Sequence, residues 1–256
     1  MSIKLSAVII TFNEEEHLEK CLSSLLGIAD EIVVVDSYST DDTKKICKDF
    51  NVRFIEQKFL GYKEQKNFAL TQAKHDYILS LDGDEALSDT LKKSILKVKN
   101  NWNKDGYYCN RLNNYCGQWI RHSDWYPDRK LRLFKKDSGT WKGINPHDCF
   151  TLKVGKKSER IKGDLLHWIY KDYEEHNQKI ERFSSIAAQA YYDLGIKSSL
   201  LKIIWRPSWA FFKAYFLKRG FLDGFNGWEI CVQTYNVTFL KYIKLRELWR
   251  QNNMKR

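Results

Sequence analysis

The sequence predicts an α/β fold with a doubly wound, mainly parallel sheet, followed by a helical extension rich in aromatic and basic residues. Over roughly the first hundred residues, short β-branched runs alternate with helical patterns, which is the order of elements in a parallel sheet. Polar and acidic residues stand directly after three of these runs, where such sheets bind ligands. Hydrophobic residues make up 43% of the 256, enough to bury a core.

Four short segments are predicted to be strands, and Ile32–Val35 among them is a continuous β-branched run, as in a strand buried on both faces. The four segments are Leu5–Ile10, Ile32–Val35, Arg53–Ile55 and Tyr77–Leu81. Helical periodicity fills the intervals at 14–26, 41–50 and 63–73. We expect Ser39 or Thr40 to be the N-cap of the second of these helices.

The pattern changes after about residue 106. Strands are predicted over Tyr107–Leu112 and Lys130–Phe134, joined by an aromatic and basic loop. A long helix follows over 172–194 and ends at Gly195. We therefore expect a ligand-binding domain over 1–170, with a first part to about 105 and a second part over about 106–170. A helical segment over 171–256 completes the chain.

The formal net charge of +11 indicates an acidic partner, whether nucleic acid, anionic lipid or a phosphorylated small molecule. The six cysteines form no C-x-x-C pair, so neither structural zinc nor a disulfide framework is expected. The N-terminal apolar run is too short for a signal peptide, and no stretch reaches the roughly 20 apolar residues that span a bilayer. We therefore predict free thiols and a cytoplasmic protein.

The segment Asp82-Gly83-Asp84, after the fourth strand, is the strongest local signal. In an extended segment residues i and i+2 project the same way, so both carboxylates can face one cation. Mg²⁺ or Mn²⁺ held by one or two carboxylates and substrate phosphates is a common arrangement, and Gly83 would let the backbone approach a ligand closely. The alternative is an ordinary acidic turn, but the position at the ligand-binding edge favours a functional role.

Four other polar residues each have a functional and a structural interpretation. Asp36 can bind a base imide or a ribose hydroxyl, or it can cap the helix that follows. Lys66 can pair with a phosphate, although a lone lysine is more often a surface residue. Asp148 can act as a general base, or it can stand in a surface turn after Pro146. His167 can bind a metal, or it can be a core histidine, the more common case.

Nine separate stretches resemble glycosyltransferase family 2, and within it the branch that includes lipopolysaccharide core-biosynthesis glycosyltransferases. They are VIITFNE at 8–14, DEIVVVDS at 30–37, STDDT at 39–43, QKNFAL at 65–70, LSLDGDE at 79–85, WYPD at 125–128, RLF at 132–134, GDLLH at 163–167 and RGFLDG at 219–224. The resemblance implies a GT-A fold and an inverting glycosyltransferase. The enzyme would move a sugar from a nucleoside diphosphate, as in a UDP-hexose, to a lipid-linked saccharide such as lipopolysaccharide core.

The resemblance also implies roles for individual residues. The nucleotide-sugar donor would be bound by Thr11, Asn13, Glu14, Asp36, Lys66, Asp82 and Gly83. Mg²⁺ or Mn²⁺ would be held by Asp84 and Asp82, with His167 as a third ligand, and would neutralise the leaving diphosphate. The catalytic base falls on Asp148. The first part of the domain would then bind the donor and the second part the acceptor.

Two positions depart from the pattern of this branch. Gly83 stands where alanine is usual, a change that we expect to be sterically harmless. Asp148 stands where glutamate is usual, and its side chain reaches one methylene less far.

The last sixty residues contain twelve Lys or Arg against three acids, together with four tryptophans. If residues 199–218 are helical despite Pro207, then Lys202, Arg206 and Lys213 fall within an arc of about 40°. Basic charge beside aromatic side chains is typical of a helix in a membrane interface. The alternative is a helix packed on the catalytic domain with its lysines extended into water. We favour binding to an anionic membrane surface, with the protein peripheral at the inner face of the plasma membrane.

Two other functions agree with parts of the sequence. A nucleotidyltransferase acting on sugar phosphates also uses a doubly wound sheet and a metal-bound carboxylate pair, but it usually has a glycine-rich basic loop after the first strand. A basic nucleic-acid-binding module would explain the net charge. Acidic residues at three strand ends would repel its phosphates, so no nucleic-acid partner is expected.

Overall fold

The computed structural model describes residues 2–144 and 147–254. Within these ranges the chain folds into two compact units. The sheet unit contains the residues up to 112 together with 128–168, and the helical unit contains 113–127 and the residues from 169 onward. The segment 113–127 thus belongs with the C-terminal helices, whereas the expected division had a single boundary near residue 170.

Four parallel strands form the centre of the sheet unit. They are β1 (Leu5–Thr11), β2 (Glu31–Asp36), β3 (Arg53–Glu56) and β4 (Tyr77–Asp82), in the order β3-β2-β1-β4. The helices between them are α1 (Leu18–Leu25), α2 (Thr43–Asp49) and α3 (Tyr62–Gln72), which confirms the predicted alternation. The register pairs Thr11 with Asp36, and Ile10 with Asp82, so the polar ends of β1, β2 and β4 meet at one edge.

Antiparallel strands extend the sheet beyond β4. The strands β8 (Asp128–Lys135), β6 (Gly106–Tyr115), β11 (Ser158–Tyr170) and β5 (Glu85–Leu87) follow in that order. Helix α4 (Asp89–Asn100) begins after β5, where the Ser88 hydroxyl accepts a hydrogen bond from the Leu91 N–H. A separate antiparallel hairpin is formed by β9 (Gly139–Ile144) and β10 (His147–Leu152). The sheet is therefore mixed, with a parallel centre.

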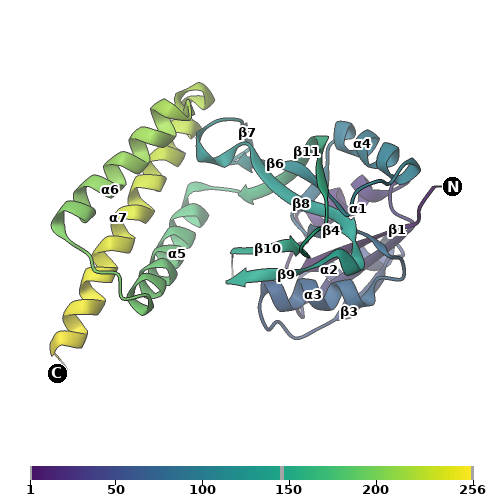
Figure 1. Cartoon of the computed structure of the whole chain (residues 1–256), viewed down its shortest axis with the longest axis horizontal. Coiled ribbons are helices and arrows are strands. Elements are labelled where there is room, and N and C mark those ends of the chain that lie inside the picture. Colours follow the sequence, from purple (N-terminus) through teal and green to yellow (C-terminus); the bar gives the residue numbers. More distant parts are fainter. Residues whose placement is uncertain (1, 145–146, 255–256) are drawn as a thin grey trace. The chain divides into compact units, whose positions relative to one another are not determined.

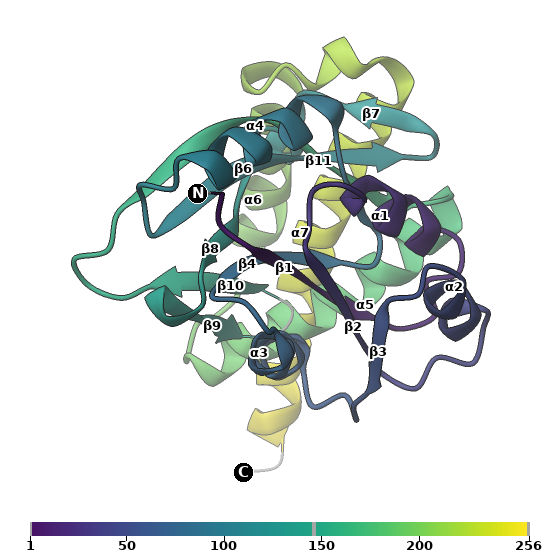
Figure 2. The ribbon, with the colours of Figure 1, turned by 90° about the vertical axis from the view of Figure 1, so that its right-hand side faces the viewer.

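Helices cover both faces of this sheet, as Figure 2 shows. On one face, Leu5 and Ile9 of β1 are buried in a core with α1 and α4. On the other face, Val8 is buried in a core with α3 and the β9–β10 hairpin. Because side chains alternate along a strand, one β-branched run supplies both cores. This two-sided burial is the doubly wound arrangement that the sequence predicts.

The helical unit consists mainly of three helices. They are α5 (Tyr173–Asp193), α6 (Leu200–Phe212) and α7 (Gly224–Met254), and α5 and α6 both pack on α7 (Figure 1). The side chains of Asp172 and Ser199 cap α5 and α6. Helix α6 continues through Pro207 and into a π-helical turn at Lys213–Leu217. Within the described residues, the helices lack an apolar stretch of the length that a bilayer crossing needs.

Candidate functional site

Asp36 joins the loops that follow β1 and β2. Its buried carboxylate accepts hydrogen bonds from the Thr11 hydroxyl at 2.9 Å and from the Ser39 backbone N–H at 2.7 Å. The Ser39 hydroxyl also donates to Asp36, so it organises this loop and does not cap α2. Because α2 begins later, at Thr43, and has no side-chain cap bond, the cap prediction for Ser39 or Thr40 is wrong.

The loop after β2 also fixes Asn13 and Glu14. Asn13 has a left-handed φ of 52°, and its side-chain oxygen accepts a hydrogen bond from the Thr40 N–H at 2.9 Å. The Glu14 N–H donates to the Thr43 hydroxyl at 2.9 Å. The structure thus gathers four of the predicted donor-binding residues at one edge of the sheet: Thr11, Asn13, Glu14 and Asp36.

Gly83 packs directly against this edge. A Cβ atom on Gly83 would lie 2.9 Å from Thr11 Cγ2 and 3.0 Å from Glu14 Cγ, closer than side chains tolerate. Glycine therefore fits closely at this position, whereas an alanine would require Thr11 or Glu14 to shift. Gly83 and Asp84 form a tight turn between β4 and β5, and that turn touches the loop after β1.

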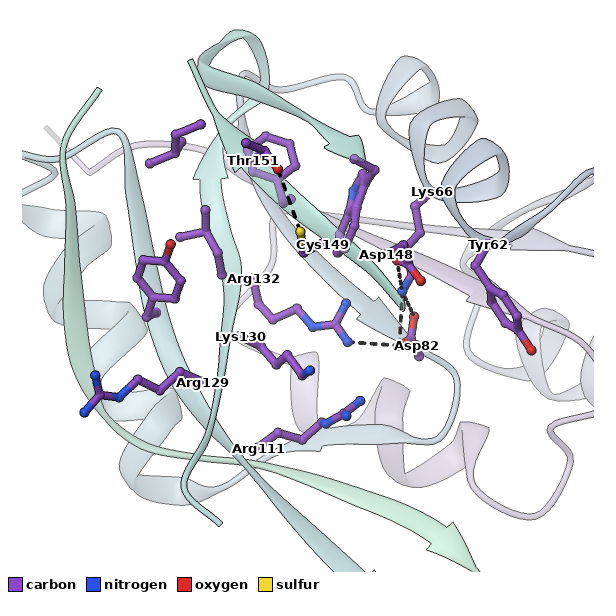
Figure 3. Close-up of a pocket in the computed structure, with 15 residues that line it drawn as sticks. Tyr62, Lys66, Asp82, Arg111, Arg129, Lys130, Arg132, Asp148, Cys149 and Thr151 are labelled. Atoms are coloured by element: carbon purple, nitrogen blue, oxygen red, sulfur yellow. Dashed lines mark hydrogen bonds and ion pairs between the residues drawn. The ribbon is translucent and has the colours of Figure 1, made fainter. Parts of the chain in front are cut away.

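Lys66 lies within a buried group of charges at the end of β4 (Figure 3). Its ammonium is 3.0 Å from Asp82 Oδ1 and 2.9 Å from Asp148 Oδ2. Arg132 also binds Asp82, at 2.9 Å, and lies 2.7 Å from Glu85 Oε1. Lys66 is only 5% exposed, so its interpretation as a surface lysine is wrong. Side chains from α3, β4, β5, β8 and β10 meet in this group.

The charges in this group depend on one another. Burial alone would raise the pKa of Asp82, but Lys66 and Arg132 outweigh it and hold that pKa well below its usual range. Burial would likewise lower the pKa of Arg132, but Glu85 and Asp82 raise it further above its ordinary value. Asp82 and Arg132 therefore both stay ionised at neutral pH. Removing either would leave the other, a buried charge, with one partner fewer.

Asp84 points to a different partner from Asp82. Its Oδ2 lies 3.4 Å from His167 Nε2, and His167 stands on β11 opposite Glu85 of β5. Burial raises the pKa of Asp84, but His167 outweighs this effect and lowers it. The premise that the D-x-D segment is extended is wrong, because the turn at Gly83 separates the two carboxylates. Asp82 binds cations of the protein, and Asp84 pairs with a histidine.

Asp84 and His167 have the chemistry of a partial metal site. The other oxygen of Asp84, Oδ1, is buried and has no hydrogen-bond partner among the described residues. No group of three or more His, Cys, Asp or Glu side chains in residues 2–144 and 147–254 is arranged to enclose a metal. Mg²⁺ or Mn²⁺ with one or two protein ligands completes its coordination with substrate phosphates and water, so this pair fits such an ion.

A cavity of about 770 Å³ opens over the charged group. Its walls carry more cations than carboxylates: Lys66, Arg111, Arg129, Lys130 and Arg132 line it together with Asp82 and Asp148 (Figure 3). The volume lies within the usual range for small-molecule sites. An excess of positive charge around two acids suits an anionic ligand that also presents hydroxyl groups.

Asp148 stands on a strand, contrary to the loop that the sequence indicated. In β10 it is paired with Gly143 of β9, and Phe150 further along stacks on Phe134 with ring centroids 3.5 Å apart. The interpretation as a loop rested on Gly143 and Pro146, but a glycine in a hairpin is compatible with pairing. Residues 145 and 146 lie outside the described residues.

Asn67 attaches the hairpin to α3. Its side-chain oxygen accepts a hydrogen bond from the Trp141 N–H at 3.0 Å, and its amide donates to the Trp141 carbonyl at 3.1 Å. The Trp141 ring lies under the Lys66 ammonium, 4.6 Å from the ring centroid. Its indole N–H is buried without a hydrogen-bond partner among the described residues, and Trp141 lines the cavity. A ligand oxygen would satisfy this donor.

Sequence reasoning assigned no role to Arg132, Glu85, Arg111 or Trp141. The sequence does contain a sign that Arg132 is functional, because this charged residue interrupts the apolar strand run Leu131–Phe134. The residue is buried there. A buried arginine requires a carboxylate partner. Glu85 and Arg111, 3.6 Å apart, belong to the same buried group but stand in runs too short or too polar to indicate it.

The chain is similar to known glycosyltransferases along most of its length. The profile of the family described as glycosyl transferase family 2 matches residues 6–160. An uncharacterized glycosyltransferase of Rickettsia bellii is 32% identical, over 98% of this chain and 88% of the relative. The lipopolysaccharide core biosynthesis glycosyltransferase LpsC of Rhizobium meliloti is 28% identical, over 88% of this chain and 85% of the relative.

A mannosyltransferase of Pyrobaculum calidifontis, solved in complex with GDP-Man and Mn²⁺, is similar in fold, with a TM-score of 0.55 and 14% identity. The alignment covers 98% of this chain and 88% of that one.

Proposed function

The chain belongs to glycosyl transferase family 2 and has the GT-A fold, and from that premise we propose its reaction. It transfers a hexose from a nucleoside diphosphate, as in a UDP-hexose, to a hydroxyl group of a lipid-linked saccharide such as lipopolysaccharide core. The relative named for lipopolysaccharide core biosynthesis supports the acceptor class. The mannosyltransferase crystallised with GDP-Man supports a nucleotide-sugar donor.

One observation carries the proposal: Lys66 bridges Asp82 and Asp148 in a single cavity, at 3.0 and 2.9 Å. Asp82 ends the strand that leads into the donor-binding turn, and Asp148 comes from the separate β9–β10 hairpin. Lys66 therefore brings a donor-side and an acceptor-side carboxylate to one place. A displacement at the anomeric carbon needs a cation for the leaving diphosphate and a base for the attacking hydroxyl, the parts proposed for Lys66 and Asp148.

The donor would lie along the gathered loops and the cations. Thr11, Asn13, Glu14 and Asp36 provide the edge for the nucleoside, and Gly83 leaves room for the packed loop. Lys66 and Arg132 would stabilise the negative charge of the diphosphate. Asp84 and His167 would hold Mg²⁺ or Mn²⁺, which when bound supplies Lewis-acid stabilisation of the leaving group. Asp82 then acts by fixing Lys66 and Arg132.

Asp148 is the proposed general base. Its carboxylate is nearly buried, at 5% side-chain exposure, and its oxygen faces the Lys66 ammonium. A carboxylate accepts a proton from a hydroxyl group in its ionised form, which is also the form that pairs with an ammonium. The strand position of Asp148 and the Asn67 contacts hold that oxygen at a fixed place above the cavity.

The metal assignment gives the first test. The Asp84→Asn variant should lose sugar-nucleotide turnover in the presence of Mn²⁺ by about 10²-fold or more, because an amide is a poor ligand for a hard cation. Binding of Mn²⁺ itself, followed by its electron paramagnetic resonance signal, should weaken in parallel. Asp89→Asn, on the surface of α4, is the matched control and should change neither quantity. Full turnover of Asp84→Asn in excess chelator would refute the metal site.

A further inference from the structure

One face of the helical unit exposes a continuous row of large apolar side chains. The row runs along α6 and the turn after it, with exposed fractions of 64% for Trp205, 44% for Trp209 and 51% for Phe216. Its members are Leu201, Ile204, Trp205, Trp209, Phe212 and Phe216. At 100° per residue they occupy one side of the helix, and Ile203 and Pro207 on the opposite side are buried.

The aromatic members of this row are in contact with one another. Trp205 and Trp209 stack with ring centroids 6.3 Å apart, Trp209 and Phe212 at 5.7 Å, and Phe212 and Phe216 at 5.2 Å. Scattered apolar residues are normal on a protein surface, but a contiguous patch marks a binding surface. We call this row the α6 aromatic face.

A cationic cavity of about 260 Å³ lies beside the α6 aromatic face. Arg206, Lys213 and Lys241 line it, together with the ring of Trp209. Lys213 pairs with Asp124 at 3.1 Å, the one carboxylate that lines the cavity. Arg206 has no ion pair in the described part of the chain.

Lys241 contacts aromatic rings and pairs with no acid among the residues that the structure describes. Its ammonium lies 4.6 Å from the ring centroid of Tyr191 and 4.9 Å from that of Tyr242. Three cations against one acid leave a net charge of two in the cavity walls. A phosphate group would neutralise that charge.

The geometry points to a docking surface for an anionic phospholipid bilayer. We propose that the α6 aromatic face enters the boundary between headgroups and acyl chains, while a headgroup phosphate occupies the cavity of Arg206, Lys213 and Lys241. Tryptophan beside basic charge is the composition of proteins at this boundary. Residues 200–217 contain three cations and no acidic residue, which matches an anionic surface.

The cations that line the cavity differ from the three that the helical wheel predicted. Of the trio expected from the helical wheel, Lys202 directs its ammonium to the Lys197 carbonyl at 2.8 Å and does not line the cavity. Lys241, from α7, takes its place. A second copy of the chain is a poor occupant for this surface, because a two-fold contact would bring the same cations against each other.

This inference rests on the proposed function in one respect: a lipid-linked acceptor must be reached at a membrane, which explains why the enzyme would bind one. Its test does not need catalysis. The full chain is sedimented with vesicles of phosphatidylcholine alone and with vesicles that also contain phosphatidylglycerol. Wild type should bind the anionic vesicles more tightly, and high salt should weaken that binding.

Two double variants separate the contributions of the cationic cavity and of the α6 aromatic face to vesicle binding. Arg206→Gln with Lys241→Gln should weaken binding to anionic vesicles about 30-fold, at the usual contribution of a basic residue near such a surface. Trp205→Ser with Trp209→Ser should weaken binding to vesicles by roughly tenfold or more. The controls remove two exposed charges or two exposed apolar side chains from the sheet unit: Lys93→Gln with Lys97→Gln, and Leu26→Ser with Leu96→Ser. They should bind as wild type does.

Three results would overturn the inference. The first is a wild-type chain that does not bind anionic vesicles. The second is equal binding by the test and control variants. The third is a wild-type dimer, seen by light scattering, that becomes a monomer in the tryptophan variant while vesicle binding is unchanged. Thermal unfolding confirms that each variant is folded. Sugar-nucleotide turnover without acceptor, measured on the same samples, should be unchanged in the α6 variants. Absence of turnover in wild type that still binds vesicles would count against the proposed function alone.

Discussion

The two units place charged and apolar side chains in opposite ways. In the sheet unit, Arg132 and Glu85 are buried as an ion pair 2.7 Å apart. In the helical unit, Trp205 and Phe225 are 64% and 78% exposed. Buried ions lose hydration and exposed rings gain nothing from burial, so neither arrangement stabilises the fold as a buried apolar side chain does. The first arrangement suits the proposed anionic donor, and the second suits the proposed membrane surface.

The largest expected effect is in the buried charges. Arg132→Met should lower the free energy of unfolding by about 3–5 kcal/mol, because Asp82 and Glu85 then lose a cation inside the protein. Urea unfolding measures the change. The matched control is Arg129→Met, on the same strand but exposed, which should change stability by about 0.5 kcal/mol at most. Equal stability of the two variants would mean that water reaches the charged group.

The helical unit should respond to pH through His176. Burial lowers the pKa of His176 to about 4, its ring stacks on Tyr170 at 4.3 Å, and its Nδ1 lies 3.2 Å from the Tyr115 hydroxyl. The unfolded chain therefore binds a proton from about pH 6.5, which the folded chain accepts only near pH 4. The free energy of unfolding should keep its full value above pH 6.5 and fall by about 3 kcal/mol as the pH drops to 4.

The His176→Phe variant isolates this contribution. A phenyl ring keeps the stacking but cannot be protonated, so the decrease in stability between pH 6.5 and 4 should be smaller by about 3 kcal/mol. Urea unfolding across that range measures it. An unchanged pH dependence in the variant would show that His176 is protonated in the folded chain.

The smallest of the three effects concerns Asp148, the proposed general base. Asp148→Asn should lower the transfer rate by about 10²-fold, close to 2.7 kcal/mol, while donor affinity changes little. Asp148→Glu, which restores the carboxylate, should recover part of the rate. Rates are measured at saturating donor, and donor binding by calorimetry. If Asp148→Asn loses donor binding while bound donor still reacts normally, the residue belongs to the nucleotide site.

The fold could be predicted because the parallel strands are buried on both faces. Val33–Val35 is a continuous apolar run, and Ile78–Leu81 is apolar except for Ser80, a composition that an exposed element would not show. The edge position of Thr11 and Asp36 then follows from parallel pairing alone. The short strand β5 and the β9–β10 hairpin could not be predicted, because three-residue runs and polar hairpins have no distinctive period.

The sequence indicated several residues of the candidate site, but it did not indicate which of them contact one another. Lys66 lies on a helix whose sequence is not strongly amphipathic, so nothing local indicates that it is buried. The separation of Asp82 from Asp84 depends on a turn that an extended-strand rule ignores. Only Arg132 carried a local signal, a charge within an apolar strand. Contacts between distant segments decide such pairings, and local patterns do not encode them.

Three consecutive residues of α3 reach three different parts of the candidate site. Gln65 donates to the Ser37 hydroxyl in the loop after β2 at 3.1 Å, Lys66 binds Asp82 and Asp148, and Asn67 holds the hairpin. Successive helical residues point about 100° apart, which lets one turn of helix contact all three. A tilt of α3 would therefore disturb the loop after β2, the charged group and the β9–β10 hairpin at the same time, so one helix couples the three parts of the candidate site.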